Sequence, residues 1–252
     1  MTNCLCKHLL FTGLAFFLAA SVWAQPASGE KETDAAAGDP LEQSIAAIKE
    51  LKDGVLIVRL PSKHRKIEQL TQLLDNDKLS KRKRKRMQKL LDQAIEQRDR
   101  DGEGIWDAYT KNYDFSELYF TYDTSTVHLK NGLQSGFFLN AQKEVDPSIS
   151  LAGRPFYLVG KGKVRERENS PGLDAFVILD KDFKRMKGPF PYYARYKTIS
   201  VSYTNLVKPG ESTRLMAVEA AKTFRNQFGY FYQRHVKKEK QDDSPQQKST
   251  GQ

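Results

Sequence analysis

Residues 55–60, VLIVRL, set the class of fold that this chain can adopt. The run is almost continuously apolar and β-branched, whereas a strand with one wet face alternates apolar and polar side chains. We therefore expect a strand that is buried on both faces, as in parallel or mixed sheets. Apolar residues at helical spacing precede it across 41–51, and Asp39 followed by Pro40 predicts the start of that helix.

The apolar spacing after the strand predicts two helices. The first begins after Pro61-Ser62 and extends to Leu74. The second begins at Ser80 and keeps its helical phase through the sequence DGEG, so we expect one long helix over 81–112, weakened at its two glycines. A strand, a helical crossover and a second strand together predict a parallel βαβ unit.

The second half of the chain is rich in aromatic and β-branched runs bounded by turn residues. We expect strands at 118–122, 136–141, 155–164 and 174–180, and a further strand or a prelude to the last helix at 198–207. Short polar turns between the later strands predict an antiparallel section. Apolar residues from Leu215 to Phe231 at three- and four-residue spacing predict a C-terminal amphipathic helix. The fold class that follows is an α/β single-domain sandwich with a mixed β-sheet, a long central helix and that last helix.

The first 24 residues have the pattern of a secretory signal peptide. Lys7 precedes an apolar run of 14 residues, and Val22 and Ala24 occupy the positions at which signal peptidases prefer small residues. A membrane-spanning helix needs about 20 residues, so the length disfavours the alternative of a permanent anchor. We expect cleavage after Ala24 and export to a bacterial periplasm or exterior.

Cys4 and Cys6 are the two cysteines of the chain and both lie inside this signal. The mature protein is therefore expected to form no disulfide and to use no thiolate. The signal holds one Lys and no acid, so the 41 basic and 31 acidic side chains of the whole chain leave a net charge of +9 after cleavage. A basic exported protein favours anionic partners, although net charge carries no information on the fold.

Two segments are too polar to bury much surface, and we expect both to be disordered: a leader at 25–39 and a tail at 239–252. The residues between them, 40–238, suffice for one hydrophobic core, and we predict a single α/β domain over that range.

Three segments carry a resemblance to known proteins. LKDGVLIVRLPSKHRKI (51–67), KNYDFSELYF (111–120) and DAFVILDKDFKRMKGPFPYYARY (174–196) resemble a group of exported bacterial proteins of unknown function. The likeness covers most of 45–235. It implies export and a single domain, and it brings no activity, cofactor or site residue with it.

Six consecutive cations open the long helix: Lys81, Arg82, Lys83, Arg84, Lys85 and Arg86. Successive residues of a helix are rotated by about 100°, so these charges surround the helix and cannot form one stripe. We expect this end to project beyond the sheet with the side-chain stems lying along apolar surface. Two interpretations stay open: a solvated helix end, and a cationic knob that binds anionic lipid, lipopolysaccharide or polysaccharide, with nucleic acid as the less favoured partner.

Candidates for catalysis are scattered. Asp123 and His128 follow one predicted strand and Asp180 ends another, where α/β folds place ligand-binding loops. No nucleophile elbow, zinc-binding spacing or phosphate-binding loop accompanies them. Polar residues after a strand are first of all turn formers. The three residues are therefore only candidates, and they belong to the alternative function of a cofactor-free hydrolase or glycan-acting enzyme with a site near Asp123 and His128.

The densest aromatic cluster is GPFPYYARY, residues 188–196. Its two prolines exclude a central strand or a helix interior. Phe190, Tyr192 and Tyr193 are candidates for a platform on which a sugar or a base stacks. The alternative is that these rings pack over a sheet edge, or that the segment contacts another protein of the envelope.

The sequence as a whole predicts an exported protein with a basic surface that binds or assists an envelope component and catalyses no reaction. We expect no cofactor, no metal site, and no transmembrane segment after removal of the signal. The sequence does not indicate which anionic partner is bound, what the oligomeric state is, or whether the protein is periplasmic or extracellular.

Overall fold

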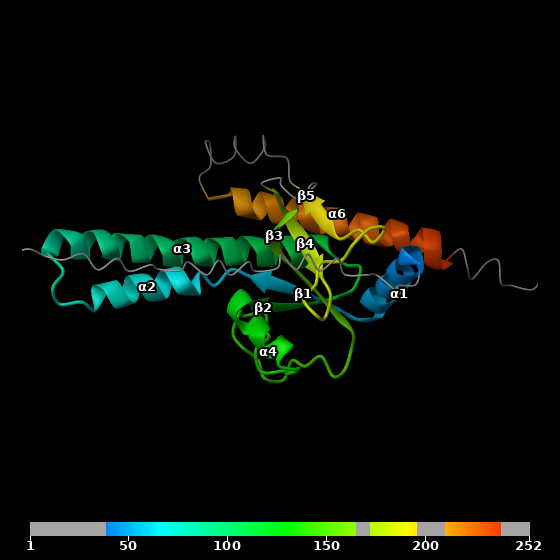
Figure 1. Ribbon diagram of the computed structural model, residues 1–252, viewed down its shortest axis with the longest axis horizontal. Helices are drawn as coiled ribbons and strands as arrows, with labels where there is room; N and C mark the ends of the chain where they lie inside the picture. Colours follow the sequence, from blue (N-terminus) through cyan, green and yellow to red (C-terminus); the bar gives the residue numbers. More distant parts are fainter. Residues whose placement is uncertain (1–38, 165–171, 196–209, 238–252) are drawn as a thin grey trace, which may run out of the picture. The chain divides into compact units, whose positions relative to one another are not determined.

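The computed structural model describes residues 39–164, 172–195 and 210–237, and a five-stranded sheet lies at its centre (Figure 1). The strand order is β2-β1-β3-β4-β5. The strands are β1 (Val55–Leu60), β2 (Glu117–Tyr122), β3 (Phe156–Val164), β4 (Leu173–Leu179) and β5 (Tyr193–Arg195). β1 runs parallel to β2 and β3, whereas β4 runs antiparallel to β3 and β5. The mixed α/β fold that the sequence predicted is therefore confirmed.

Four helices match the predicted ranges closely: α1 (Pro40–Asp53), α2 (His64–Leu74), α3 (Lys81–Asn112) and α6 (Ser212–Tyr232). The structure adds a short helix that the sequence did not predict, α4 (Thr126–Lys130), a 3₁₀ turn η1 (Asp123–Ser125) and a π-helical turn η2 (Gln233–Lys237). Asp39 caps α1 by accepting a hydrogen bond from the Leu41 N–H at 3.0 Å. The long central helix α3 continues unbroken through DGEG. All these elements belong to one compact unit.

Burial on both faces of β1 explains its apolar run. Leu56 and Val58 face the larger core, which α1, α3 and α6 complete, and Val55 and Ile57 face a second core on the opposite side. All four side chains are fully buried. A strand in the middle of a mixed sheet with both faces covered leaves little room for polar side chains, and in β1 the single exception is Arg59, next to the carboxyl end.

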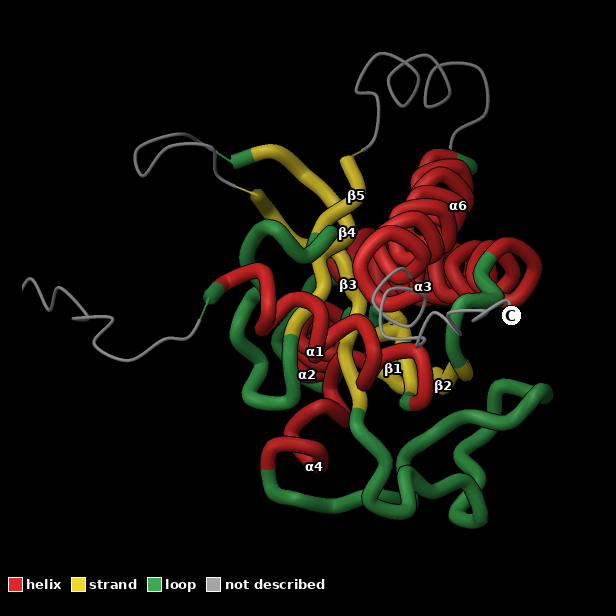
Figure 2. Tube along the Cα trace, turned by 90° about the vertical axis from the view of Figure 1, so that its right-hand side faces the viewer, coloured by secondary structure: helices red, strands yellow, loops and turns green. Residues whose placement is uncertain are grey.

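The larger core is aromatic and lies between the sheet and the helices. Figure 2 shows α3 and α6 together on one side of the strands. Phe224 and Phe228 of α6 stack with ring centroids 5.3 Å apart, and Tyr109 of α3 lies 6.0 Å from Phe176 of β4. Such aromatic contacts bury large areas and stabilise the packing of the helices on the sheet.

The opposite face of the sheet is covered by α4 and the irregular segment 131–155, and here the predicted strand at 136–141 is wrong. Phe137 and Phe138 are buried against the sheet as a covering segment and not as a strand of it. The Leu139 N–H donates to the Phe120 carbonyl at 2.9 Å, and the Thr121 hydroxyl donates to the Phe137 carbonyl. The aromatic run at 136–141 therefore indicates a buried segment, and a covering segment is buried as a strand is.

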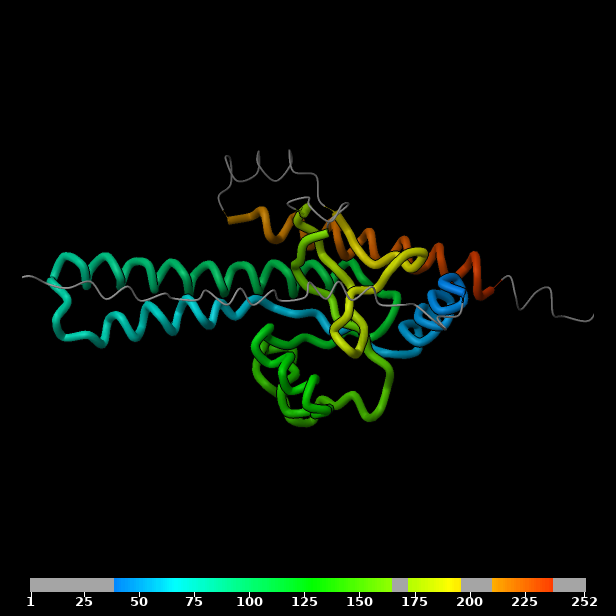
Figure 3. Tube along the Cα trace, viewed as in Figure 1, coloured from blue at the N-terminus to red at the C-terminus, as the bar shows by residue number. Residues whose placement is uncertain are grey.

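Helices α2 and α3 form a two-helix hairpin that extends beyond the sheet, coloured blue to green in Figure 3. We call α2, the turn 75–80 and the part of α3 up to Arg100 the arm. Leu70 of α2 and Ala94 of α3 are the buried side chains of its seam. The predicted strand at 198–207 and the predicted leader and tail lie outside the described residues.

Candidate functional site

The tip of the arm carries the six consecutive cations, Lys81 to Arg86, and all six side chains are exposed. Ser80 caps the helix, with its hydroxyl accepting from the Lys83 N–H at 3.5 Å. The first turn of α3 contains no acidic residue. None of the six forms an ion pair with a carboxylate among the described residues. The tip is thus a concentration of unneutralised positive charge.

Arg84 differs from its neighbours because it has a structural role. Its guanidinium donates to the Leu74 carbonyl at 2.6 Å and to the Asn76 carbonyl at 3.2 Å. These carbonyls lie at the end of α2, where the helix leaves its last acceptors without intrahelical partners. Arg84 therefore holds the turn of the arm, and the remaining five cations are free of such bonds among the described residues.

A second basic site lies at the base of the arm, at the carboxyl ends of β1 and β2. A cleft of about 610 Å³ opens there, lined by Arg59, residues 62–66, Asp123 and Thr124. Open α/β sheets place their ligands outside the carboxyl ends of parallel strands, because the loops that follow the strands meet there. Asp123, a candidate from the sequence, lies in this cleft.

Local hydrogen bonds fix the wall of the cleft. The Ser62 N–H donates to the Asp123 carboxylate at 3.0 Å, which ties the β1–α2 loop to the end of β2. The Ser62 hydroxyl accepts from the His64 N–H at 3.2 Å. Lys63 adopts a left-handed backbone conformation, with φ of 49°, and starts α2 without a side-chain cap.

Arg59 is the only charged residue of β1. Its side chain lies against Gly160 of the neighbouring strand β3 and lines the cleft. Its Nε is shielded from solvent and has no hydrogen-bond partner among the described residues. Burial lowers the pKa of Arg59, and the charge of Asp123 raises it in part. A half-buried guanidinium without an acceptor is costly, because it loses water and gains no partner.

Two lysines lie close to the base of the arm. Lys63 forms an ion pair of 3.8 Å with Asp101 of α3, and Lys161 of β3 donates to the Thr213 hydroxyl of α6 at 2.9 Å. Burial lowers the pKa of both lysines, and Asp101 raises it in part. The region around the cleft thus holds more positive charge than its carboxylates neutralise.

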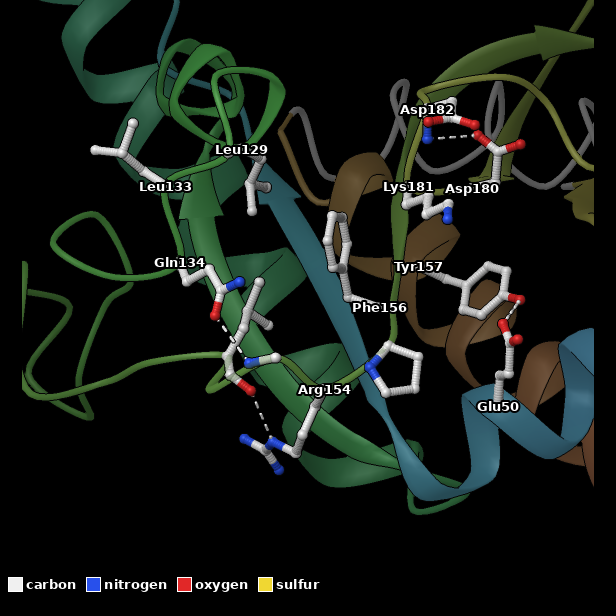
Figure 4. A pocket seen from close by; sticks show the side chains of 14 residues that line it. Glu50, Leu129, Leu133, Gln134, Arg154, Phe156, Tyr157, Asp180, Lys181 and Asp182 are labelled. Carbon is white, nitrogen blue, oxygen red and sulfur yellow. Dashed lines mark hydrogen bonds between the residues drawn. The ribbon is translucent and has the colours of Figure 1, made fainter.

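A second hollow, of about 600 Å³, lies at the amino ends of β1 and β3, at the opposite end of these strands from the cleft (Figure 4). Leucines and Phe156 line much of it. Its polar groups are engaged with one another: Tyr157 donates to Glu50 at 3.0 Å, and the Gly153 N–H donates to the Gln134 side chain. Arg154 forms an ion pair with Glu117. We see no convergent set of free polar groups in it.

The three catalytic candidates do not come together. Asp123 follows the carboxyl end of β2, whereas Asp180 follows β4, which runs antiparallel, and so lies at the other edge of the sheet, roughly 15–20 Å away along the strands. Asp180 accepts from the N–H groups of Asp182 and Lys184 and closes a turn. His128 is exposed on α4, stacked on Phe137, with no hydrogen bond to Asp123.

The aromatic candidates divide between the core and the surface. Phe190 is 1% exposed and packs against Phe228 with ring centroids 5.6 Å apart, so its ring serves the core. Tyr192 and Tyr193 are half-buried, and their ring centroids lie 4.9 Å apart. They line a hollow of about 280 Å³ at the edge strand β5, which agrees with the interpretation that these rings pack over a sheet edge.

Sequence reasoning missed the cleft at the base of the arm. Arg59 stands inside an apolar strand and belongs to no recognisable binding motif. Lys63 and Lys66 have the pattern of one end of an ordinary helix. The one available signal was a charged residue in a run that is otherwise continuously apolar, since such a residue needs a polar exit at the end of the strand.

Comparison with known protein families, curated proteins and solved structures finds no match to this chain. Within the described residues, no group of three or more His, Cys, Asp or Glu side chains converges as a metal site. No helix of the described ranges is both long and apolar enough to span a membrane.

Proposed function

We propose that this is an exported, non-enzymatic binding protein that contacts an anionic component of the bacterial envelope through the tip of its arm. The observation that carries the proposal is the charge of the tip. Eight cations lie between Asp77 and Asp92 and no acid lies among them. Export is supported by the signal-like pattern of residues 1–24.

The folding of the arm does not account for these charges. A cation in the first turn of a helix opposes the helix dipole and costs about 0.3–1 kcal/mol at low salt. Neutral residues such as Gln have a similar helix propensity, so the cations are not needed to form α3. Only Arg84 makes hydrogen bonds that stabilise the turn. A partner with negative charge supplies the missing stabilisation.

The geometry favours a surface over a groove-bound duplex. Lys81, Arg82, Lys83 and Lys85 surround the end of one helix and form no stripe along it. The charges therefore meet a plane of anionic headgroups at the end of the arm more readily than they follow a nucleic-acid backbone. The enzymatic alternative gains no support, because Asp180 lies at the other end of the strands and the Asp123 carboxylate accepts from the Ser62 N–H and not from His128.

The test replaces Lys81, Arg82, Lys83 and Lys85 by Gln and keeps Arg84 for the turn. Each cation near an anionic membrane surface contributes about 1 kcal/mol, so we expect sedimentation with phosphatidylglycerol vesicles to weaken by at least about 100-fold at low salt. Binding of the unchanged protein should fall steeply as salt is added. Binding to lipopolysaccharide is measured in parallel.

The matched control removes the same number of exposed cations away from the arm, by Lys181, Lys184, Lys187 and Lys222→Gln. It has the same net charge as the tip variant, and we expect it to keep most of the vesicle binding. An equal loss of vesicle binding in the two variants would show that binding depends on the net charge of the protein and not on the tip. Retention on DNA and not on vesicles would replace the envelope partner by nucleic acid.

A further inference from the structure

The cleft at the base of the arm is separate from the tip. It lies where α2 begins, whereas the tip lies where α2 ends, and the 11 residues of α2 span about 16 Å. A ligand in the cleft and a surface at the tip therefore meet different side chains. Binding of a ligand in the cleft does not depend on the function proposed for the tip.

Positive charge dominates the cleft. Arg59, Lys63, Arg65 and Lys66 line it together with His64, and Asp123 is its one carboxylate. The acids nearby already have partners: Asp101 pairs with Lys63, and Glu68 pairs with His64 at 3.6 Å. The Asp123 carboxylate accepts the Ser62 N–H. The described acids thus leave Arg59, Arg65 and Lys66 without an ion pair.

Arg59 is the group that most needs an acceptor. It forms no hydrogen bond and no ion pair with the described residues, although its Nε is shielded from water. A guanidinium carries five N–H donors in a planar fork that matches the oxygens of a carboxylate or a phosphate. A protein that buries this group without an acceptor loses stability, unless a ligand supplies the oxygens.

The start of α2 adds a second, independent preference for an anion. Its first turn contains no acid and three potentially positive side chains, and its N-cap residue, Lys63, makes no side-chain capping bond. Among the described residues, the Ser62 hydroxyl accepts from the His64 N–H alone. Local rules favour the opposite, a capping oxygen and acidic residues. Positions at which a chain breaks such rules are often functional sites, where a ligand restores the balance.

We propose that the cleft binds a phosphate group, with the Arg59 guanidinium as its main hydrogen-bond donor and Lys63, Arg65 and Lys66 as its charge partners. The cleft of about 610 Å³ exceeds the size of one phosphate, so it also admits the organic group that bears it. Two sources share this chemistry: a soluble phosphate ester, and the phosphodiester headgroup of a lipid.

The experiment is calorimetric titration of the whole protein with inorganic phosphate, glycerol phosphate and glycerophosphoglycerol, combined with thermal unfolding. At about 100 times the dissociation constant, the ligand should raise the melting temperature by about 5 °C or more. Arg59→Met keeps the apolar stem and removes the fork, and we expect at least a tenfold loss of affinity. Lys66→Gln should weaken binding roughly threefold, as expected for a surface charge.

The matched control is the tip variant, Lys81, Arg82, Lys83 and Lys85→Gln, which should bind phosphate as the unchanged protein does. Binding of the monoesters alone assigns a soluble source, and equal binding of glycerophosphoglycerol assigns a lipid headgroup. Unaltered binding in Arg59→Met, or an equal shift with chloride at the same ionic strength, overturns the proposal. If Arg59→Met does not fold, the exposed pair Arg65→Gln and Lys66→Gln replaces it, with a tenfold loss expected. Whether the cleft binds phosphate or not, the expected binding of the tip to vesicles stays the same.

Discussion

Tyr109 lies in the last turn of α3 and Tyr113 directly follows the helix, and the two side chains have different surroundings. Both side chains are buried. The Tyr113 hydroxyl is 2.8 Å from the Ser116 hydroxyl, whereas the Tyr109 hydroxyl has no hydrogen-bond partner among the described residues. A buried hydroxyl without a partner costs about 1–3 kcal/mol, and a made hydrogen bond contributes about 1 kcal/mol.

The two tyrosines should therefore respond oppositely to loss of the hydroxyl. We expect Tyr109→Phe to raise the free energy of unfolding by about 1 kcal/mol, and Tyr113→Phe to lower it by about 1 kcal/mol. Urea unfolding of the two variants measures both values. A destabilised Tyr109→Phe would show that this hydroxyl has a partner, such as a trapped water molecule.

Alkaline pH gives the same residue a second signature. Burial raises the pKa of Tyr109 well above its ordinary value of about 10. Above about pH 10 the Tyr109 phenol ionises in the unfolded chain and stays neutral in the folded chain. The contribution of Tyr109 to stability is therefore constant below about pH 10 and is lost as the pH rises further.

We expect the stability gain of Tyr109→Phe to grow above about pH 10, by up to about 1.4 kcal/mol per pH unit, because the variant lacks this loss. Unfolding at pH 8, 10 and 11 measures the trend. Tyr230→Phe, at a side chain that is 64% exposed, is the control. A gain that is independent of pH would contradict a buried, neutral phenol at Tyr109.

At the scale of elements, α3 contains two glycines whose surroundings differ. No atom lies within 4 Å of the place that a methyl group would take at Gly102. At Gly104 that methyl group would lie 2.9 Å from the Arg214 Cβ of α6, closer than such carbons approach. Gly104 thus permits the close contact of α3 with α6, and Gly102 has no such role.

Alanine at the two positions should act in opposite directions. Gly102→Ala is expected to stabilise the protein by about 0.5–1 kcal/mol, since alanine favours the helix. Gly104→Ala is expected to destabilise it by about 1–3 kcal/mol, because the added carbon displaces α6. Chemical unfolding tests both. Equal gains at the two sites would mean that α6 moves without cost.

Elements with one dominant periodicity could be predicted from the sequence. The run at 55–60 and the phase of α3 each allow one secondary structure, and both ranges are confirmed. The aromatic run at 136–141 could not be assigned in this way. It is buried like a strand, but its backbone bonds to the end of β2 and to its own turns. Burial pattern alone does not separate the two cases.

At the scale of the whole molecule, the mixed sheet was predictable and the cleft was not. The sequence shows Arg59 and Asp123 as unrelated residues 64 positions apart. They meet because β1 pairs in parallel with β2, and the register places Leu60 beside Tyr122. The tip was predictable because it is contiguous in sequence, whereas the cleft depends on the pairing of strands that a helical hairpin separates.

The continuity of α3 has a mechanical consequence. One unbroken helix joins the outermost cation at Lys81 to Asp101 at the base of the arm, a span of roughly 30 Å. A molecule anchored by its tip would therefore be held by a stiff spacer and not by a tether, and its sheet would stand off from the anchoring surface at a nearly constant height. Ligands that enter the cleft would be captured at that height, away from the surface itself.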